Sequence, residues 1–272
     1  MKPAKKYTFL ETLPFRLGTT SYIVPDDILP NVRFLADRVK DVELVLFDVD
    51  EYCNIPDAAQ IQELKKIAAE HDLSYTVHLP LDLKLSTEGG QLDASMEKAL
   101  KVIEASIDLQ PFSYTLHLDN HAIQLNPTER EAQDWVDHCR KALEMLVSAI
   151  PESARLSVEN LENYPPEMNH KVFDALSFQT RQVCSDCIDI GHLWLQKRDV
   201  PSFLEERLAS TTVIHLHGIG SRDHQSLTNV APEVLKSVLD ILQQRKFSGV
   251  LTLEVFSQED FESSMERIDQ CL

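Results

Sequence analysis

The stretch VIHLHGIGSRDHQSL, residues 213–227, begins with alternating side chains and then enters a polar loop. Alternation with a period of two is typical of a β-strand that has two different faces. Three of the ten histidines of the chain lie within ten positions here, beside an aspartate. Imidazole is the commonest metal ligand near neutral pH, although a single His-x-His pair is more often a pair of hydrogen-bonded polar groups. The stretch therefore predicts a strand, and it indicates a metal site only if other segments supply further ligands.

Other segments of the chain share the length and the apolar, β-branched character of this strand. The predicted strands are residues 17–23, 41–47, 74–80, 113–119, 154–160, 183–190, 212–218 and 249–256. Between them, residues 25–39, 58–71, 131–150 and 232–245 have apolar side chains at helical spacing. Strands that alternate with helices in this way predict an α/β fold, a (β/α)8 TIM barrel. An open doubly wound sheet is the alternative, but the chain has only seven glycines and no glycine-rich turn after the first strand.

Composition limits the partners and the compartment. The 272 residues are 43% hydrophobic, which suits one barrel domain over residues 1–272. A formal net charge of -18 predicts repulsion from nucleic acids and anionic membranes, so we expect neither as a partner. Five cysteines, an odd number, favour a reducing compartment. Because no signal peptide or membrane-spanning run is evident either, we predict a cytoplasmic location.

One face of each of the last six strands ends in a side chain that can bind a metal. The residues concerned are His78, His117, Glu159, Asp189, His215 and Glu254. The opposite face of these strands is apolar, as expected where strands meet a helix layer. Since the carboxyl ends of barrel strands converge on one mouth, we expect the six side chains to lie together. His192 and His224 follow in the adjoining loops and complete a predicted set of eight ligands.

A cluster of buried carboxylates and imidazoles is costly unless a cation neutralises it. Mixed nitrogen and oxygen ligands favour zinc, manganese or iron over calcium and magnesium. Eight ligands exceed one tetrahedral site, so we predict two or three divalent ions, zinc or manganese. Glu159 is the natural bridging carboxylate. Asp189 and Glu254 are predicted with it as catalytic residues.

Residues near the same mouth are predicted to contact the substrate. Trp194 and Tyr164 follow ligand-bearing strands and could stack on a planar ligand or simply anchor their loops. His217 and Asp223, which flank the predicted ligands of the opening stretch, are predicted to bind substrate as well. His121 follows the strand at 113–119 and is a further candidate for substrate contact. The cysteines of CSDC, residues 184–187, are interpreted as packing residues.

This ligand set resembles the xylose-isomerase-like superfamily, which includes sugar isomerases, sugar epimerases and endonuclease IV. The order His, His, Glu, Asp-x-x-His, His, a loop His and Glu is similar to that of endonuclease IV, and DIGH (189–192) has its Asp-x-x-His spacing. The loop departs from that pattern. Arg222 stands where the resemblance implies an aspartate, and Asp223 adjoins His224 instead, so the resemblance does not extend to all ligands of a third metal site.

Several phrases resemble the cobamide-remodelling phosphodiesterase family over roughly residues 16–256. They are NVRFLADRVKDVELVLFD, YTVHLPLDL, VENLENYP, DIGHLW, LTLEVF, and HLHGI with its following DH and SL. The resemblance implies hydrolysis of the phosphoester in the nucleotide loop of cobamides such as adenosylcobalamin. The products would be a cobinamide phosphate and the released base nucleoside, α-ribazole. The implied partner is this small molecule. The sequence leaves open the cleaved P–O bond, the preferred lower base and the oligomeric state.

Two other functions are compatible with the same residues. A sugar isomerase or epimerase needs a single metal with two flanking carboxylates, so the surplus histidines favour hydrolysis. A metal or corrinoid carrier without catalysis gains little from so many ligands with open positions. We therefore expect a metal-dependent phosphodiesterase, with the sugar isomerase or epimerase as the alternative.

Overall fold

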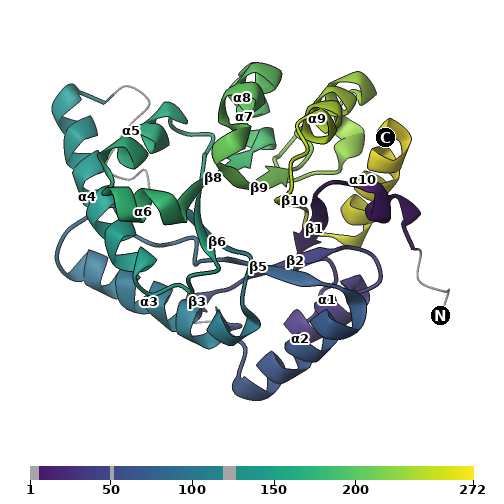
Figure 1. The fold of residues 1–272 in the computed structure, drawn as a ribbon, viewed down its shortest axis with the longest axis horizontal. Helices are drawn as coiled ribbons and strands as arrows, with labels where there is room; N and C mark the ends of the chain where they lie inside the picture. Colours follow the sequence, from purple (N-terminus) through teal and green to yellow (C-terminus); the bar gives the residue numbers. More distant parts are fainter. Residues whose placement is uncertain (1–5, 50–51, 119–126) are drawn as a thin grey trace.

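Eight parallel strands close into a barrel in the computed structural model, which describes residues 6–49, 52–118 and 127–272 (Figure 1). The strands are β1 (Arg16–Thr20), β2 (Asp41–Val45), β5 (Ser74–His78), β6 (Ser113–His117), β7 (Arg155–Glu159), β8 (Cys184–Asp189), β9 (Thr211–Leu216) and β10 (Val250–Leu253). Their order around the barrel is β1-β10-β9-β8-β7-β6-β5-β2. The predicted (β/α)8 barrel and all eight predicted strands are thereby confirmed, and the open sheet is excluded because β1 pairs with β10.

Two very short strands lie in the loop after β2. They are β3 (Asp48–Val49) and β4 (Tyr52–Cys53), which pair antiparallel. The sequence did not predict this hairpin, because two residues are too few for alternation to be recognised. The first barrel strand is also shorter than predicted. It ends at Thr20, and the Asn31 side chain then accepts hydrogen bonds from the backbone N–H groups of Ile23 and Val24, both at 2.8 Å.

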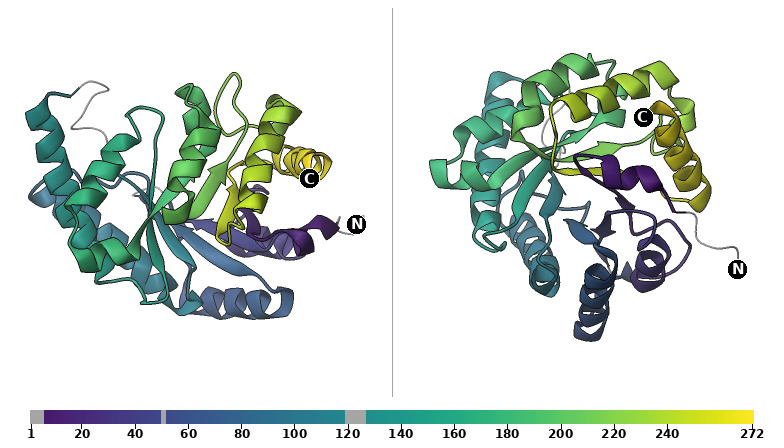
Figure 2. Two further views of the ribbon diagram at one scale, coloured as in Figure 1. Left: turned by 45° about the horizontal axis from the view of Figure 1, so that its top comes forward. Right: turned by 45° about the vertical axis from the view of Figure 1, so that its right-hand side comes forward.

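Helices surround the strands in chain order (Figures 1 and 2). They are α1 (Ile28–Leu35), α2 (Ala58–His71), α3 (Gly90–Ser106), α4 (Glu129–Val147), α5 (Glu167–Ala175), α6 (Phe178–Val183), α7 (Ile190–Leu195), α8 (Val200–Arg207), α9 (Pro232–Gln244) and α10 (Gln258–Cys271). Short 3-10 helices span Thr8–Thr12, Ile107–Leu109, Leu208–Ser210 and Leu227–Asn229. The long helices α2 and α4 begin with capping boxes, Asp57 with Gln60 and Thr128 with Glu131, which satisfy backbone N–H groups at the helix start.

The apolar core lies between the strands and the helices. Outward side chains of the strands, such as Leu44, Val77 and Leu116, are fully buried there, together with Trp135 of α4 and Phe261 of α10. Burial of this apolar surface is the main driving force of folding. Within the described residues, no helix combines the length and the apolar composition that crossing a membrane requires.

The inward face of the barrel is polar and mostly small, as the alternation predicted. Hydrogen bonds across neighbouring strands connect the hydroxyl groups of Ser113 and Ser157 at 2.6 Å and of Ser157 and Ser185 at 2.9 Å. His215 of β9 contacts Glu43 of β2 at 2.9 Å, although β10 and β1 separate these strands in the barrel. That contact therefore crosses the interior. It places both side chains inside the barrel.

Candidate metal centre

The carboxyl ends of β5 to β10 bring potential metal ligands together at one mouth. In the part of the chain that the structure describes, four groups of side chains each have donor atoms that lie within 4.8 Å of one another. The groups are His78, His117 and Glu159; Glu159, Cys187 and His215; Glu159, Asp189, His215 and Glu254; and Asp189, His192, His217 and His224. Because Glu159 and Asp189 each belong to more than one group, the residues form one continuous centre, which we call the ligand cluster.

Glu159 lies in the middle of the ligand cluster. It ends β7, and its carboxylate is 1% exposed. One oxygen, Oε2, lies 3.3 Å from His78 Nε2, 3.0 Å from His117 Nε2 and 3.3 Å from His215 Nδ1. Three imidazoles from three different strands thus point at one carboxylate oxygen. This is the arrangement expected of a bridging ligand.

The hydrogen bonds of His78 define which of its nitrogens faces the cluster. Its Nδ1 lies 2.7 Å from the carbonyl oxygen of Leu79, which can only accept, so Nδ1 carries the proton. Nε2 faces Glu159 at 3.3 Å, and this hydrogen bond raises the pKa of His78 although burial acts to lower it. A metal ion bound here would take the place of the proton on Nε2. His192 is held in the same way, with Nδ1 3.0 Å from the carbonyl oxygen of Asn160.

The segment DIGH joins β8 to α7 and contributes two potential ligands. Asp189 caps α7, since its Oδ1 accepts a hydrogen bond of 2.6 Å from the backbone N–H of His192. Gly191 lies between these two residues, and the imidazole of His217 approaches its Cα so closely that no side chain fits there. A Cβ at Gly191 would lie 2.1 Å from Cε1 of His217, so any larger residue would displace that imidazole.

His224 reaches the same region from the loop after β9. Its ring stacks on His217 with centroids 4.2 Å apart, and its Nε2 lies 3.3 Å from Glu254 Oε2. Asp223 contacts His224 Nδ1 at 3.2 Å. Arg222, at the place where the resemblance implies an aspartate, instead contacts Asp260 of α10 at 3.4 Å.

Buried polar atoms test whether these residues fit a metal. Among the described residues, several buried atoms of the ligand cluster have no hydrogen-bond partner: Asp189 Oδ2, His215 Nδ1, His217 Nε2 and Glu254 Oε2. Burial of an unpaired polar atom is costly. A divalent cation coordinated by these oxygens and nitrogens would give each of them a partner. The donor set therefore fits divalent metal, and mixed imidazole and carboxylate ligands suit zinc or manganese.

The charges of the ligand cluster support one another. Burial would raise the pKa of Glu159, but the charges of His215 and His117 hold it well below its usual range. Burial would also raise the pKa of Glu254, but the charge of His215 holds that pKa well below its usual range. Burial would lower the pKa of His224, but the carboxylate of Glu254, 3.3 Å from its Nε2, raises that pKa to about 10. Ionised carboxylates thus attract positive charge to the mouth, whether as protons on imidazoles or as metal ions.

The structure brings all eight predicted ligands into the cluster: His78, His117, Glu159, Asp189, His192, His215, His224 and Glu254. It also places His217, predicted to bind substrate, among the potential ligands. The sequence held the signal for this position, because His217 has the same parity as His215. Cys187 adjoins His215, but burial raises the pKa of its thiol well above the usual value, which agrees with a packing role.

The two residues predicted to stack on the substrate, Tyr164 and Trp194, are less accessible than that role requires. Tyr164 is fully buried, its ring packs against Trp135, and its hydroxyl donates to Asn169 at 2.8 Å. This placement contradicts a stacking role and agrees with the loop anchor. Trp194 is half-buried against the core. His121 lies outside the described residues.

Sequence reasoning missed two features at this end of the barrel. Phe256 is 44% exposed, and its ring centroid lies 5.4 Å from that of His224. It follows Glu254 by two residues, so its position after the last strand was a usable signal. Glu43 is fully buried and contacts His215. The signal there was a carboxylate at an inward position of β2, two residues after Asp41.

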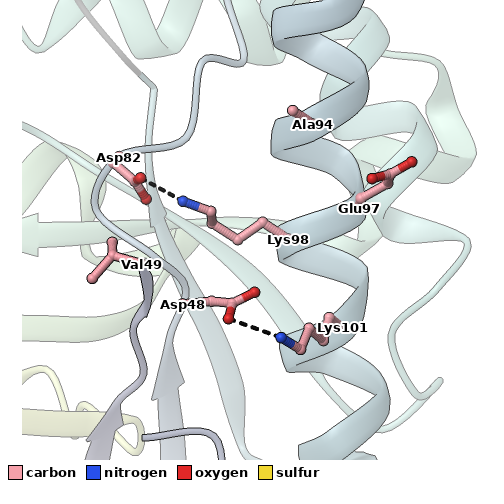
Figure 3. A pocket seen from close by; sticks show the side chains of 7 residues that line it. All are labelled: Asp48, Val49, Asp82, Ala94, Glu97, Lys98 and Lys101. Atoms are coloured by element: carbon pink, nitrogen blue, oxygen red, sulfur yellow. Dashed lines mark hydrogen bonds and ion pairs between the residues drawn. The ribbon is translucent and has the colours of Figure 1, made fainter. Parts of the chain in front are cut away.

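A surface hollow of about 680 Å³ lies between the loops after β2 and β5 and the helix α3 (Figure 3). Lys101 contacts Asp48 at 2.8 Å, and Lys98 is paired with Asp82. Each lysine that lines the hollow is therefore neutralised by a carboxylate. None of the lining residues belongs to the ligand cluster.

Comparison with known proteins gives a family and a set of folds. A family model described as xylose isomerase-like TIM barrel matches residues 40–271. A D-tagatose 3-epimerase-like protein has 16% identity, a TM-score of 0.77 and coverage of 94% of this chain and 97% of its own. The 3-keto-D-glucoside 4-epimerase from E. coli has 12% identity, a TM-score of 0.69 and coverage of 94% and 98%. An L-ribulose 3-epimerase has 16% identity, a TM-score of 0.63 and coverage of 94% and 86%. No curated protein sequence matches the chain significantly.

Proposed function

Because the chain belongs to the xylose isomerase-like TIM barrel family, we propose that it is a divalent-metal-dependent enzyme whose substrate binds at the mouth of the barrel. The reaction that we propose is hydrolysis of a phosphodiester. The observation that carries it is the sharing of Glu159 and Asp189 between neighbouring ligand groups. Shared carboxylates are the ligands that hold two ions about 3.5–4 Å apart, and such pairs are typical of phosphoester hydrolases.

The residues of the cluster would divide the work between holding ions and holding substrate. When bound, divalent ions supply an activated water near neutral pH and polarise the phosphoryl oxygens. Glu159 would bridge ions beside His78 and His117, and Asp189 would bridge ions beside His192. Glu254 would complete the coordination with His215. Phe256, exposed beside His224, is placed to contact an apolar part of the substrate.

The substrate that we propose is a cobamide, cleaved to a cobinamide phosphate and a base nucleoside. The resemblance of the quoted phrases to cobamide-remodelling phosphodiesterases supports this choice. So does charge, because one bridging phosphate is repelled far less by a chain of charge -18 than a nucleic acid would be. Exposed apolar side chains in the loops after β2 and β10, Tyr52 and Phe256, could cover a large, partly apolar ring.

Sugar epimerisation or isomerisation is the second candidate, and the comparisons favour it. Two of the solved structures described above are sugar epimerases, and the third is an epimerase-like protein. Their identities to this chain are between 12% and 16%, which supports the shared fold and not the substrate. The group of Glu159, Asp189, His215 and Glu254 alone would suffice for one metal with two flanking carboxylates. That reaction leaves His78, His117, His192 and His224 without a function.

One incubation separates the candidates. Protein loaded with zinc or manganese is mixed in parallel with adenosylcobalamin, with a panel of ketohexoses and with duplex DNA that contains an abasic site. Products are resolved by chromatography and mass spectrometry. We expect a cobinamide phosphate from the first mixture and no change in the others. An epimerised ketohexose with intact corrinoid would replace the proposal by the second candidate, and cleaved duplex would point to an endonuclease.

A further inference from the structure

Glu43 is an acidic residue in the interior of the barrel, where solvent does not reach it. It lies in the middle of β2, a strand whose end contributes no residue to the ligand cluster, and it is fully buried. Its Oε2 lies 2.9 Å from Nε2 of His215, across the interior of the barrel. An ionised carboxylate can only accept, so Nε2 of His215 donates this hydrogen bond.

The second nitrogen of the same ring faces the ligand cluster. His215 Nδ1 lies 3.3 Å from an oxygen of Glu159 and 3.2 Å from an oxygen of Glu254. Neither approach has the geometry of a hydrogen bond, since Nδ1 has no hydrogen-bond partner among the described residues. Nδ1 therefore lies between two carboxylates, where a bound cation would take the place of a proton and accept the lone pair of the ring.

We propose that Glu43 is a positioning residue that fixes the tautomer and the orientation of His215 and thereby sets the affinity of the central metal position. The central metal position is the one bounded by Glu159, Asp189, His215 and Glu254. A carboxylate behind a metal-ligating histidine keeps the proton on the distant nitrogen and makes the near nitrogen a better ligand. This inference rests on the metal dependence proposed above.

A role in packing alone explains Glu43 poorly. Its other oxygen, Oε1, has no hydrogen-bond partner among the described residues. Neither do the hydroxyl groups of Thr115 in β6 and Thr252 in β10, which are also buried. A buried ionised carboxylate with an unpaired oxygen destabilises the fold, and a non-polar residue would pack there without that cost. A negative charge on Glu43 has a function if it acts through His215 on a bound cation.

Asp41 provides a matched control on the same strand. It is also fully buried and inward, two residues before Glu43, but its carboxylate accepts hydrogen bonds from Ser74 at 2.6 Å and Thr76 at 2.8 Å and contacts no ligand. Glu43→Gln and Asp41→Asn each replace a buried carboxylate by its amide. The two variants therefore differ in whether the lost charge faces His215.

The test is a titration of metal-free protein with Zn²⁺ in competition with a chromogenic chelator, on wild type, Glu43→Gln and Asp41→Asn. It is made at pH 8, above the pKa of about 7 to which burial raises Asp41, so that the control also removes a charge. We expect one Zn²⁺ of the wild-type complement to bind about 10–100-fold more weakly in Glu43→Gln. We expect Asp41→Asn to match the wild type within about threefold, the scatter of such measurements. Equal affinities in wild type and Glu43→Gln would overturn the inference and leave the proposed function standing. A wild type that binds no Zn²⁺ would overturn both.

A second measurement needs no variant and settles the case in which Glu43→Gln fails to fold. Long-range proton–nitrogen NMR spectra of zinc-loaded wild type report the tautomer of each imidazole. We expect His215 to carry its proton on Nε2 and to show the nitrogen shift of a metal-bound Nδ1. A proton on Nδ1 in the loaded protein would overturn the inference, whatever the variants show.

Discussion

Asp41 carries the stability prediction that the structure defines most sharply. Burial raises the pKa of this carboxyl from the usual 3.8 to about 7, although hydrogen bonds from Ser74 and Thr76 act in the opposite direction. The folded state therefore holds the proton more tightly than the unfolded chain. The stability linked to it is complete below about pH 3.8 and is lost as the pH rises through about 7.

The size of the effect follows from the two pKa values. One pKa unit corresponds to about 1.4 kcal/mol, so ionised Asp41 costs the fold about 4 kcal/mol above pH 7. Between pH 5 and pH 8 the change amounts to about 2.5 kcal/mol. Asparagine resembles the protonated acid in shape and charge, and the hydroxyl groups of Ser74 and Thr76 can rotate to accept from its amide. Asp41→Asn should therefore be more stable than wild type at pH 8.

Urea unfolding of metal-free protein, followed by circular dichroism at pH 5 and pH 8, measures this directly. We expect the difference in unfolding free energy between Asp41→Asn and wild type to grow by about 2.5 kcal/mol from the lower to the higher pH. Asp108→Asn makes the same chemical change at an exposed position and should show no such growth. A difference for Asp41→Asn that stays constant within about 0.5 kcal/mol, the usual effect of a surface change, would refute the reasoning.

Three further predictions concern the ligand cluster. Glu159→Gln should lower turnover at least about 100-fold, because the amide keeps the shape of the side chain but loses the bridging charge. The circular dichroism spectrum should not change. A variant that keeps more than about a tenth of the wild-type rate would contradict a bridging role. Binding of Zn²⁺ should release protons at pH 7 and should tighten as the pH rises, because the pKa of His224 is raised to about 10 in the absence of metal. Calorimetry in buffers of different ionisation enthalpy measures the release. No proton release would contradict the charge state described for His224. Gly191→Ala should displace His217 and reduce the metal content without loss of secondary structure, as judged by elemental analysis, and an undiminished content would show that His217 holds no ion.

The strands were predictable because alternation carries their signal. Each barrel strand has an apolar face toward the helices and a polar face inward, so Val77 and His78 belong to different environments that the sequence reveals. The β3–β4 hairpin carries no such signal in its two-residue strands. After the end of β1 at Thr20, the backbone N–H groups of Ile23 and Val24 donate to a helix residue, Asn31, which no local pattern indicates.

The ligands at strand ends were predictable for the same reason, since a parallel barrel collects those ends at one mouth. The long-range contacts were not. Glu43 meets His215 across the barrel, 172 positions away in the chain. Tyr164 stands beside ligand-bearing segments in sequence, yet its loop folds inward and buries the ring against Trp135. Which loop residues face the substrate and which face the core depends on packing that a single sequence does not express.

Metal stoichiometry tests the central claim most directly. Elemental analysis of purified protein that has been saturated with zinc or manganese and then freed of loosely bound ions gives the number of ions per chain. The sharing of Glu159 and Asp189 between ligand groups predicts two or three ions. A single ion per chain, unchanged in a His78→Ala, His117→Ala double variant, would contradict the multinuclear centre and with it the proposed phosphodiesterase chemistry.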